Sequence, residues 1–142
     1  MAVTFPRPSP RGKSCTNDLD EAEAWLTSAR YLLQSGRGRP SWRTVAVAQS
    51  VHAMIKANDA LTVRFLRRRS SRHEDAAGLL KEMLRLHRIP ERYAGGRRAL
   101  LEALQEKSEF DYGGAHVGIE EAERRIRRAE KFLEAAREIL AS

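Results

Sequence analysis

Apolar residues recur at intervals of three and four along most of the chain, and no segment alternates with a period of two. This spacing places apolar side chains on one face of an α-helix. It is clearest near the end of the chain, where seven apolar positions are separated by alternating steps of three and four residues: Ile119, Ala122, Ile126, Ala129, Leu133, Ala136 and Leu140. The pattern predicts an all-α protein.

Breakers and capping residues divide this pattern into helical segments. Thr16 or Asp18 can cap the first helix, and Ser70 or Ser71 can cap the third. Gly36, Pro40, Pro90 and the pairs Gly95, Gly96 and Gly113, Gly114 mark stops, starts and turns, with a short turn from Pro90 to Tyr93. The expected helices cover approximately residues 18–36, 40–66, 70–89, 97–112 and 119–140.

The short connections between these segments predict an antiparallel up-and-down helical bundle of four to five helices. The regular apolar seam of the last helix can also be interpreted as a coiled-coil dimer. However, about three heptads with alanine at every second seam position make a weak coiled coil, so packing within one chain is favoured.

Length and composition place the chain among ordinary globular proteins. Its 142 residues, 42% of them apolar, are enough for one domain, so we expect a flexible tail containing proline and arginine at residues 1–16 and a single domain at 17–142. No apolar run approaches the ~20 residues of a membrane span. Cys15 is the only cysteine, which excludes an intrachain disulfide and fits a cytoplasmic protein. We expect no metal site and no cofactor.

Positive charge is concentrated in the middle of the chain. The formal net charge is +7, yet residues 30–98 hold 16 Lys/Arg and 5 Asp/Glu, a local net of +11, whereas residues 119–142 hold six of each. A field of this sign attracts polyanions, so nucleic acid, a nucleotide or an acidic protein surface is the expected partner. A solvated arginine-rich surface without a ligand is the alternative.

The strongest local concentration follows the second helix. Arg64, Arg67, Arg68, Arg69 and Arg72 lead into His73. Guanidinium groups bind phosphate, and imidazole transfers protons near neutral pH. We therefore expect these residues to bind a nucleic acid or nucleotide, provided that folding gathers them into one electropositive hollow.

Polar residues also interrupt the apolar stripe of the second helix. Asn58 and Thr62 lie at its centre, while His52, Lys56 and Asp59 lie at or near its edge. One interpretation is an inter-helix hydrogen bond from Asn58 that fixes the register of packing. The other is a ligand-facing groove beside His52, Lys56 and Asp59.

The order of these features resembles that of the HEPN domain family over roughly residues 18–141. The resemblance is carried by Ala22-x-x-Trp-Leu-x-x-Ala, His52-Ala-Met-Ile-Lys-Ala-Asn-Asp-Ala-Leu, Ser71-Arg-His-x-x-Ala-x-x-Leu-Leu, Lys107-x-x-x-x-Tyr112-Gly, and Glu120-Glu-Ala with Phe132-Leu. It implies an up-and-down bundle, usually dimeric, found beside nucleotidyltransferases, in toxin-antitoxin pairs and in host-defence ribonucleases. Some members cut RNA without a metal, while others bind nucleotides or act as partners.

Members that cut RNA share an Arg-x4-6-His motif whose side chains meet across a dimer interface. Five residues separate Arg67 from His73 and four separate Arg68 from it, so the resemblance makes these three residues catalytic candidates. The motif is expected later in the bundle, yet no arginine precedes His116 with four to six residues between them, since those positions hold Glu109, Phe110 and Asp111. In such a site the histidine transfers protons and the arginine neutralises charge developing on the phosphate.

Two further features have alternative interpretations. Tyr112 can stack on a base or cover a helix end. The arginines of residues 124–128 alternate with glutamates at i,i+4 spacing, as expected of a solvated face that needs no ligand.

Three functions are expected, in this order. The first is a HEPN-like protein that binds nucleic acid or a nucleotide as part of a toxin-antitoxin or nucleotidyltransferase-associated system. The second is a metal-independent endoribonuclease of toxin type, and the third is a module that docks an acidic partner such as an antitoxin or a nucleotidyltransferase. A homodimer is expected in each case.

Overall fold

Five α-helices make up most of the described chain. The computed structural model describes residues 13–36, 38–113 and 116–142, with side chains for 15–36, 38–109 and 116–142. Two short 3-10 turns, η1 (His73–Asp75) and η2 (Glu91–Tyr93), precede the third and fourth helices. The helices are α1 (Lys13–Ser35), α2 (Pro40–Leu66), α3 (Ala76–Arg85), α4 (Ala94–Gly113) and α5 (Ile119–Ala141). None of these described residues forms a strand, which confirms the all-α prediction.

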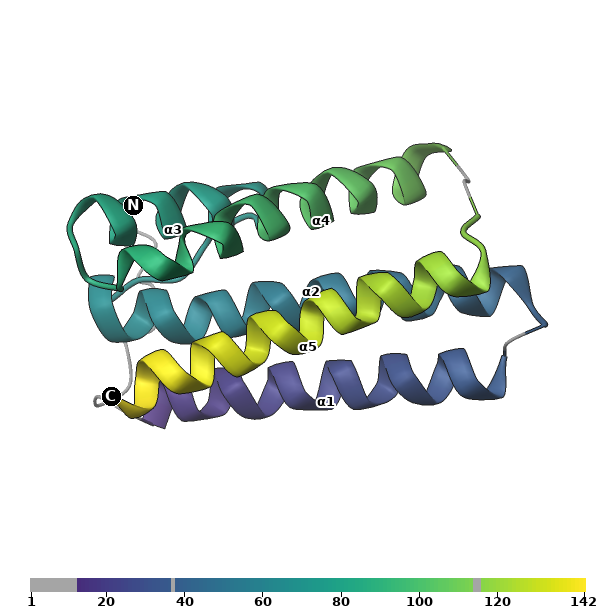
Figure 1. Cartoon of the computed structure of the whole chain (residues 1–142), viewed down its shortest axis with the longest axis horizontal. Helices are drawn as coiled ribbons and strands as arrows, with labels where there is room; N and C mark the ends of the chain where they lie inside the picture. Colours follow the sequence, from purple (N-terminus) through teal and green to yellow (C-terminus); the bar gives the residue numbers. More distant parts are fainter. Residues whose placement is uncertain (1–12, 37, 114–115) are drawn as a thin grey trace, which may run out of the picture.

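The long helix α2 is the centre of the bundle. Figure 1 shows α1 and α5 on one side of it and α3 and α4 on the other. The most extensive packing joins α1 to α2 and α2 to α5, whereas α4 and α5 meet over only a few residues. The helices α4 and α5 thus both pack on α2 but contact each other little.

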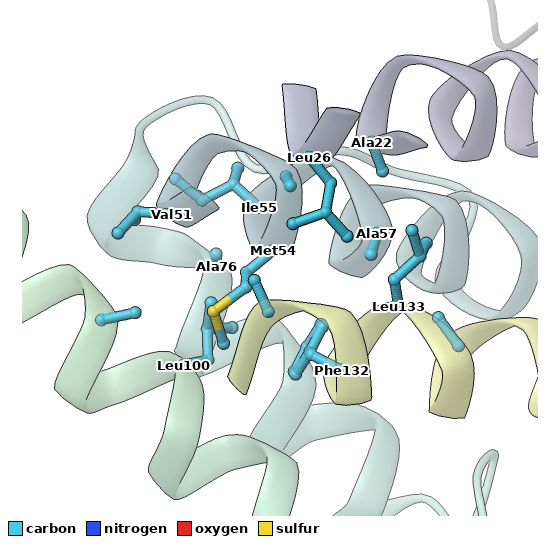
Figure 2. Close-up of a cluster of buried hydrophobic side chains, with 14 of the residues drawn as sticks. Ala22, Leu26, Val51, Met54, Ile55, Ala57, Ala76, Leu100, Phe132 and Leu133 are labelled. Atoms are coloured by element: carbon cyan, nitrogen blue, oxygen red, sulfur yellow. The ribbon is translucent and has the colours of Figure 1, made fainter. Parts of the chain in front are cut away.

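Large and small side chains alternate in the core. Leu26 from α1, Met54 from α2, Leu100 from α4 and Leu133 from α5 are almost fully buried in one cluster (Figure 2). The seam of α5 contributes three fully buried alanines, Ala122, Ala129 and Ala136. Because alanine adds little bulk, α5 can approach its neighbours closely, as the periodicity predicted.

Two helix starts differ from the sequence-based expectation. α1 begins at Lys13, so Thr16 and Asp18 lie inside the helix and do not cap it, and the expected tail of residues 1–16 overlaps the helix. Residues 1–12 of that tail lie outside the described part. α4 begins at Ala94, so the glycine pair at 95 and 96 forms its first turn instead of preceding it.

The third helix also starts later than expected. α2 ends at a left-handed residue, Arg67 (φ 59°, ψ 35°), whose N–H bonds to the carbonyl oxygen of Thr62. Neither Ser70 nor Ser71 caps α3, because the Ser70 hydroxyl donates to Asp59 and the Ser71 hydroxyl to Asp75. The chain crosses from α2 to η1 in an irregular segment, which brings Arg69 against Asp18 of α1.

Candidate functional site

Two buried carboxylates hold the segment after α2. We call residues 67–73 the anchored loop. Arg69 donates to both oxygens of Asp18 in α1, at 2.8 and 3.4 Å, and Asp18 is only 1% exposed. Next to it, the hydroxyl of Ser70 donates to Asp59 in α2 at 2.9 Å, and Asp59 is 4% exposed. Consecutive loop residues are therefore tied to two different helices.

Burial governs the ionisation of both anchors. Desolvation raises the pKa of Asp18 above its ordinary value, although the hydrogen bond and charge of Arg69 oppose the shift. Desolvation likewise raises the pKa of Asp59, opposed by its hydrogen bonds from Ser70 and reinforced by the negative charge of Asp18. Burial, together with the negative charge of Glu21 beside Asp18 and of Asp18 beside Asp59, raises both pKa values, so each carboxylate is easier to protonate than an exposed one.

His73, the last residue of the anchored loop, packs on His52, which in turn stacks on Trp25. The ring of His52 lies parallel to Trp25, with centroids 4.8 Å apart, and the ring of His73 meets His52 edge-on at 5.1 Å. Beside them, the Lys56 ammonium lies 3.4 Å from the Glu21 carboxylate. His52, Lys56 and Asp59 thus all have partners within the chain.

The arginines of the anchored loop do not form one electropositive hollow. A hollow of about 460 Å³ does open beside them, but Glu74, Asp75 and Glu82 line it together with Arg68 and Arg69. Arg72 is also shared between acids, with guanidinium nitrogens 3.6 Å from Glu74 and 3.9 Å from Asp75. The expectation of a purely basic hollow was wrong, because acidic residues that follow the arginines in sequence fold back beside them.

The polar centre of the α2 stripe is structural. Asn58 is fully buried, and its amide nitrogen donates to the carbonyl oxygen of Ala76 at 2.9 Å. Thr62, also fully buried, donates to the carbonyl oxygen of Asp59 one turn earlier. The predicted inter-helix hydrogen bond is confirmed, and it fixes the first turn of α3 on α2.

A different concavity combines an apolar surface with a row of basic side chains. The α4/α5 groove has a volume of about 430 Å³ and opens where these two helices diverge. Its apolar floor includes Leu61, Leu80, Ile89, Tyr93, Phe132 and Ile139. Its basic lining consists of Arg92, Arg124, Arg127, Arg128 and Lys131, and no acidic side chain among the described residues lines it. This volume lies within the range of ligand pockets in proteins.

The basic groups of the groove differ in their partners. Arg124 pairs with Glu121 at 2.5 Å, and Arg92 lies over the Tyr93 ring, 4.8 Å from its centroid. No described carboxylate lies within ion-pair distance of Arg127 or Lys131. These two side chains stand one helical turn apart on the same face of α5. Both are exposed, so both are available to an anion in the groove.

The expected ladder along α5 is only partly present. Arg125 pairs with Glu121 at i,i+4, as predicted. Arg125 and Arg128 also reach across to Glu106 of α4, and Arg128 is only 11% exposed. The interpretation of this face as wholly solvated was therefore wrong, since part of it ties α5 to α4.

Comparison with known proteins identifies the fold family. Residues 18–139 match the HEPN domain, which is most of the chain. The protein belongs to the HEPN domain family. No curated protein matches the sequence.

Within this HEPN domain, the residues of the Arg-x4-6-His spacing have different surroundings. The described ring contact of His73 is with His52, while Arg68 lines the mixed-charge hollow. In the later segment, His116 lies 3.1 Å from the Thr44 hydroxyl. The side chain of Tyr112 lies outside the described residues, so its expected role stays a prediction.

Neither a cluster of metal-ligating side chains nor a membrane-spanning helix occurs among the described residues of the HEPN domain. No three His, Cys, Asp or Glu side chains there gather closely enough to hold a metal ion. None of the described helices combines the length and apolar character needed to cross a bilayer.

Sequence reasoning missed the α4/α5 groove. Arg124, Arg127 and Lys131 are spaced to form one helical stripe, and that spacing was available in the sequence. The glutamates that alternate with these arginines in sequence favoured the interpretation of the stripe as an ion-paired, solvated face. The fact that α4 and α5 diverge depends on the packing of both helices against α2, which periodicity does not specify.

Proposed function

We propose that this HEPN domain binds nucleotides or single-stranded nucleic acid in the α4/α5 groove. The observation that carries the proposal is the lining of the groove, in which the described residues place five basic side chains and no acidic one around an apolar floor. A nucleotide unit has the complementary character, since its base is flat and weakly polar and its phosphate is anionic.

The proposed orientation follows from the position of these groups. Arg127 and Lys131 would receive phosphate oxygens, because both cations lack a described carboxylate partner. The base would enter the apolar part of the groove near Tyr93 and Phe132, where aromatic rings provide stacking surface. Along α5, the lining extends from Arg124 to Ile139, roughly 22 Å at the helical rise, which leaves room for more than one nucleotide.

The anchored loop is a weaker candidate for the same ligand. Its hollow is lined by two arginines and three acidic residues, so a phosphate entering it would meet negative charge. The loop arginines would instead act at long range by steering polyanions toward the protein.

The test compares charge removal at these two places. Fluorescence anisotropy of a labelled oligouridine of about ten nucleotides measures affinity for a single strand. The double variant Arg127→Gln, Lys131→Gln is expected to weaken binding about tenfold or more. The matched variant Arg67→Gln, Arg68→Gln removes the same charge and is expected to change affinity by less than about threefold. The reverse order would overturn the placement of the ligand in the groove.

Two glycines allow a test by shape that leaves charge unchanged. Gly95 lines the α4/α5 groove and Gly78 lines the mixed-charge hollow, and a Cβ atom at either position meets no other atom within 4 Å. Gly95→Leu should block the groove without disturbing the fold, whereas Gly78→Leu should leave oligouridine binding unchanged. If the wild-type protein binds oligouridine and neither substitution changes its affinity, the ligand lies elsewhere.

A second candidate function, metal-independent RNA cleavage, is favoured by the His52 and His73 pair. The two imidazoles are 5.1 Å apart, and His73 is exposed beside the loop arginines. One imidazole would take the proton of a ribose 2′-hydroxyl as its oxygen attacks the adjacent phosphorus, and the other would protonate the departing 5′-oxygen. The family resemblance adds a homodimer in which the two copies complete the site.

Cleavage of total RNA in the presence of EDTA tests this second function. Activity should disappear in His73→Ala and persist in His116→Ala, and size-exclusion chromatography with light scattering should show a dimer. A folded wild-type protein that leaves RNA intact would exclude the ribonuclease while leaving oligouridine binding as a separate measurement. Binding of an acidic protein without any oligouridine affinity would favour the protein-docking alternative.

A further inference from the structure

The α4/α5 groove meets a basic corner at one end of the bundle. We call residues 85–98 the basic corner; they lead from the end of α3 through η2 into the first turns of α4. α4 begins at the end of the bundle where α5 finishes (Figure 1), and there the Tyr93 hydroxyl bonds to Glu138 at 3.4 Å. Arg92 and Tyr93 belong both to the corner and to the groove lining. A ligand that fills the groove therefore touches the corner at Arg92.

Positive charge is concentrated in this corner. Residues 85–98 contain five arginines and one acidic residue, Glu91. Three of the arginines are exposed, and no carboxylate among the described side chains lies within ion-pair distance of them: Arg88, Arg92 and Arg98. Arg85 differs, because its guanidinium lies 2.7 Å from the Glu82 carboxylate. Three cations of the corner are thus available to an external anion.

The rim of α5 changes sign where it approaches the corner. On one face of α5, Arg127 and Lys131 are followed by Glu134 and Glu138. A polyanion that contacts Arg127 and Lys131 would meet negative charge if it continued along α5. Arg92 of η2 lines the same groove, so the favourable path leads from Lys131 to Arg92 and away from α5.

We propose that the basic corner binds backbone phosphates of a single strand that leaves the α4/α5 groove past Arg92. This inference rests on the proposed function and deepens it, because an oligonucleotide longer than the groove becomes the preferred ligand over a free nucleotide. Arg88 and Arg98 flank Arg92 in the chain and are not among the residues that line the groove. They add contacts that a ligand confined to the groove does not make. Arginine contacts to phosphate carry no base preference, so the corner raises affinity for any sequence.

Isothermal titration calorimetry with ligands of two lengths tests the corner. Decauridylate is long enough to leave the groove, whereas 5′-phosphorylated diuridylate is short enough to stay within it. The double variant Arg88→Gln, Arg98→Gln should weaken decauridylate binding about fivefold or more and leave diuridylate binding within about twofold of the wild type. The same variant should make the slope of log affinity against log salt less steep by about 1.4 for decauridylate.

Three control variants separate phosphate contact from other effects. Arg88→Lys with Arg98→Lys keeps both charges and should retain most of the affinity for decauridylate. Arg85→Gln removes an arginine of the same corner that already has a carboxylate partner, and should change affinity by less than about twofold. Arg127→Gln with Lys131→Gln should weaken both ligands, since these cations line the groove itself.

The outcomes distinguish the corner from the groove. Equal wild-type affinity for the two ligands, or an Arg88→Gln, Arg98→Gln protein that binds decauridylate like the wild type, would overturn the corner and leave the groove as the site. Equal losses for both ligands in that variant would also overturn it, because the two arginines would then act on the groove and not on a strand outside it.

Two further results would redirect the interpretation. A decaglutamate peptide that displaces decauridylate as effectively as unlabelled decauridylate does would replace the strand with an acidic protein partner and overturn the inference. A wild-type protein that binds neither uridylate would contradict the proposed function, and the role of the corner with it.

Discussion

Arg128 of α5 and Glu106 of α4 form a nearly enclosed inter-helix ion pair. Both terminal guanidinium nitrogens of Arg128 donate to the Glu106 carboxylate, at 3.0 and 2.5 Å. Only 11% and 14% of the two side chains are exposed. Because α4 and α5 otherwise share little contact, this pair limits how far the two walls of the α4/α5 groove can separate.

Glu106→Gln should therefore destabilise the protein measurably. The substitution leaves the enclosed Arg128 guanidinium without its main counter-charge, which we expect to lower the free energy of unfolding by about 1–3 kcal/mol. Urea denaturation followed by circular dichroism measures this change. Glu82→Gln removes an exposed i,i+3 pair with Arg85 and should leave the midpoint almost unchanged. Equal midpoints for both variants would show that the inter-helix pair contributes no more than a surface pair.

Asp59 and Glu121 should give pH dependences of opposite sign. Burial raises the pKa of Asp59, so the folded chain binds this proton more tightly than the unfolded chain does. Its contribution to the free energy of unfolding therefore falls as pH rises from the ordinary value of 3.8 through the raised pKa. Arg124 and Arg125 lower the pKa of Glu121 to about 2, and its contribution is lost as pH falls from the ordinary 4.5 toward that value.

Urea titrations at a series of pH values, repeated with Asp59→Asn and Glu121→Gln, isolate these two contributions. The stability difference between wild type and Asp59→Asn should decrease with rising pH, while the difference for Glu121→Gln should increase with rising pH. Parallel difference curves would contradict the assignment of the two carboxylates to a buried and a hydrogen-bonded environment.

The salt dependence of oligouridine binding should report on Arg127 and Lys131. Each phosphate contact to a single strand contributes about −0.7 to the slope of log affinity against log salt. Arg127→Gln with Lys131→Gln should therefore make the slope less steep by about 1.4. The paired loop variant, Arg67→Gln with Arg68→Gln, should keep a slope close to that of the wild type. A slope unaffected by the groove substitutions would mean that these cations do not contact phosphate.

Leu133→Ala should lower the stability of the bundle strongly, because the core depends on close packing. Leu133 is 1% exposed in the cluster of Figure 2, and its truncation is expected to cost about 2–5 kcal/mol. Leu101 is 42% exposed on α4, so Leu101→Ala should have a much smaller effect. Thermal denaturation of both variants checks the contrast, and similar melting temperatures would contradict the placement of Leu133 in the core.

Helical periodicity predicted most of the fold because it records which faces are buried. The seam of α5 and the bounds of α2 agree with the sequence-based expectation. Helix starts were less predictable. Asp18 has the side chain of a good cap, yet it lies inside α1, where it anchors Arg69. A polar side chain that can bond locally or across the fold does not reveal from sequence which partner it takes.

Charge was harder to interpret than periodicity. The arginines of residues 67–72 stand out as a block in sequence, but η1 and α3 bring Glu74, Asp75 and Glu82 beside them. In contrast, Arg127 and Lys131 are surrounded by glutamates in sequence and still lack a described carboxylate partner in the structure. Net charge along a chain averages over neighbours in sequence, whereas a ligand meets neighbours in space.

Arg67 and His87 adopt left-handed backbone conformations, with φ of 59° and 55°. Residues other than glycine adopt this backbone conformation at a cost of about 1 kcal/mol or more. Glycine at either position would thus offer an engineer a more heat-resistant variant without touching the core. At residue 67 that gain in robustness would also discard a cation from the surface, so the two positions are not equivalent starting points for redesign.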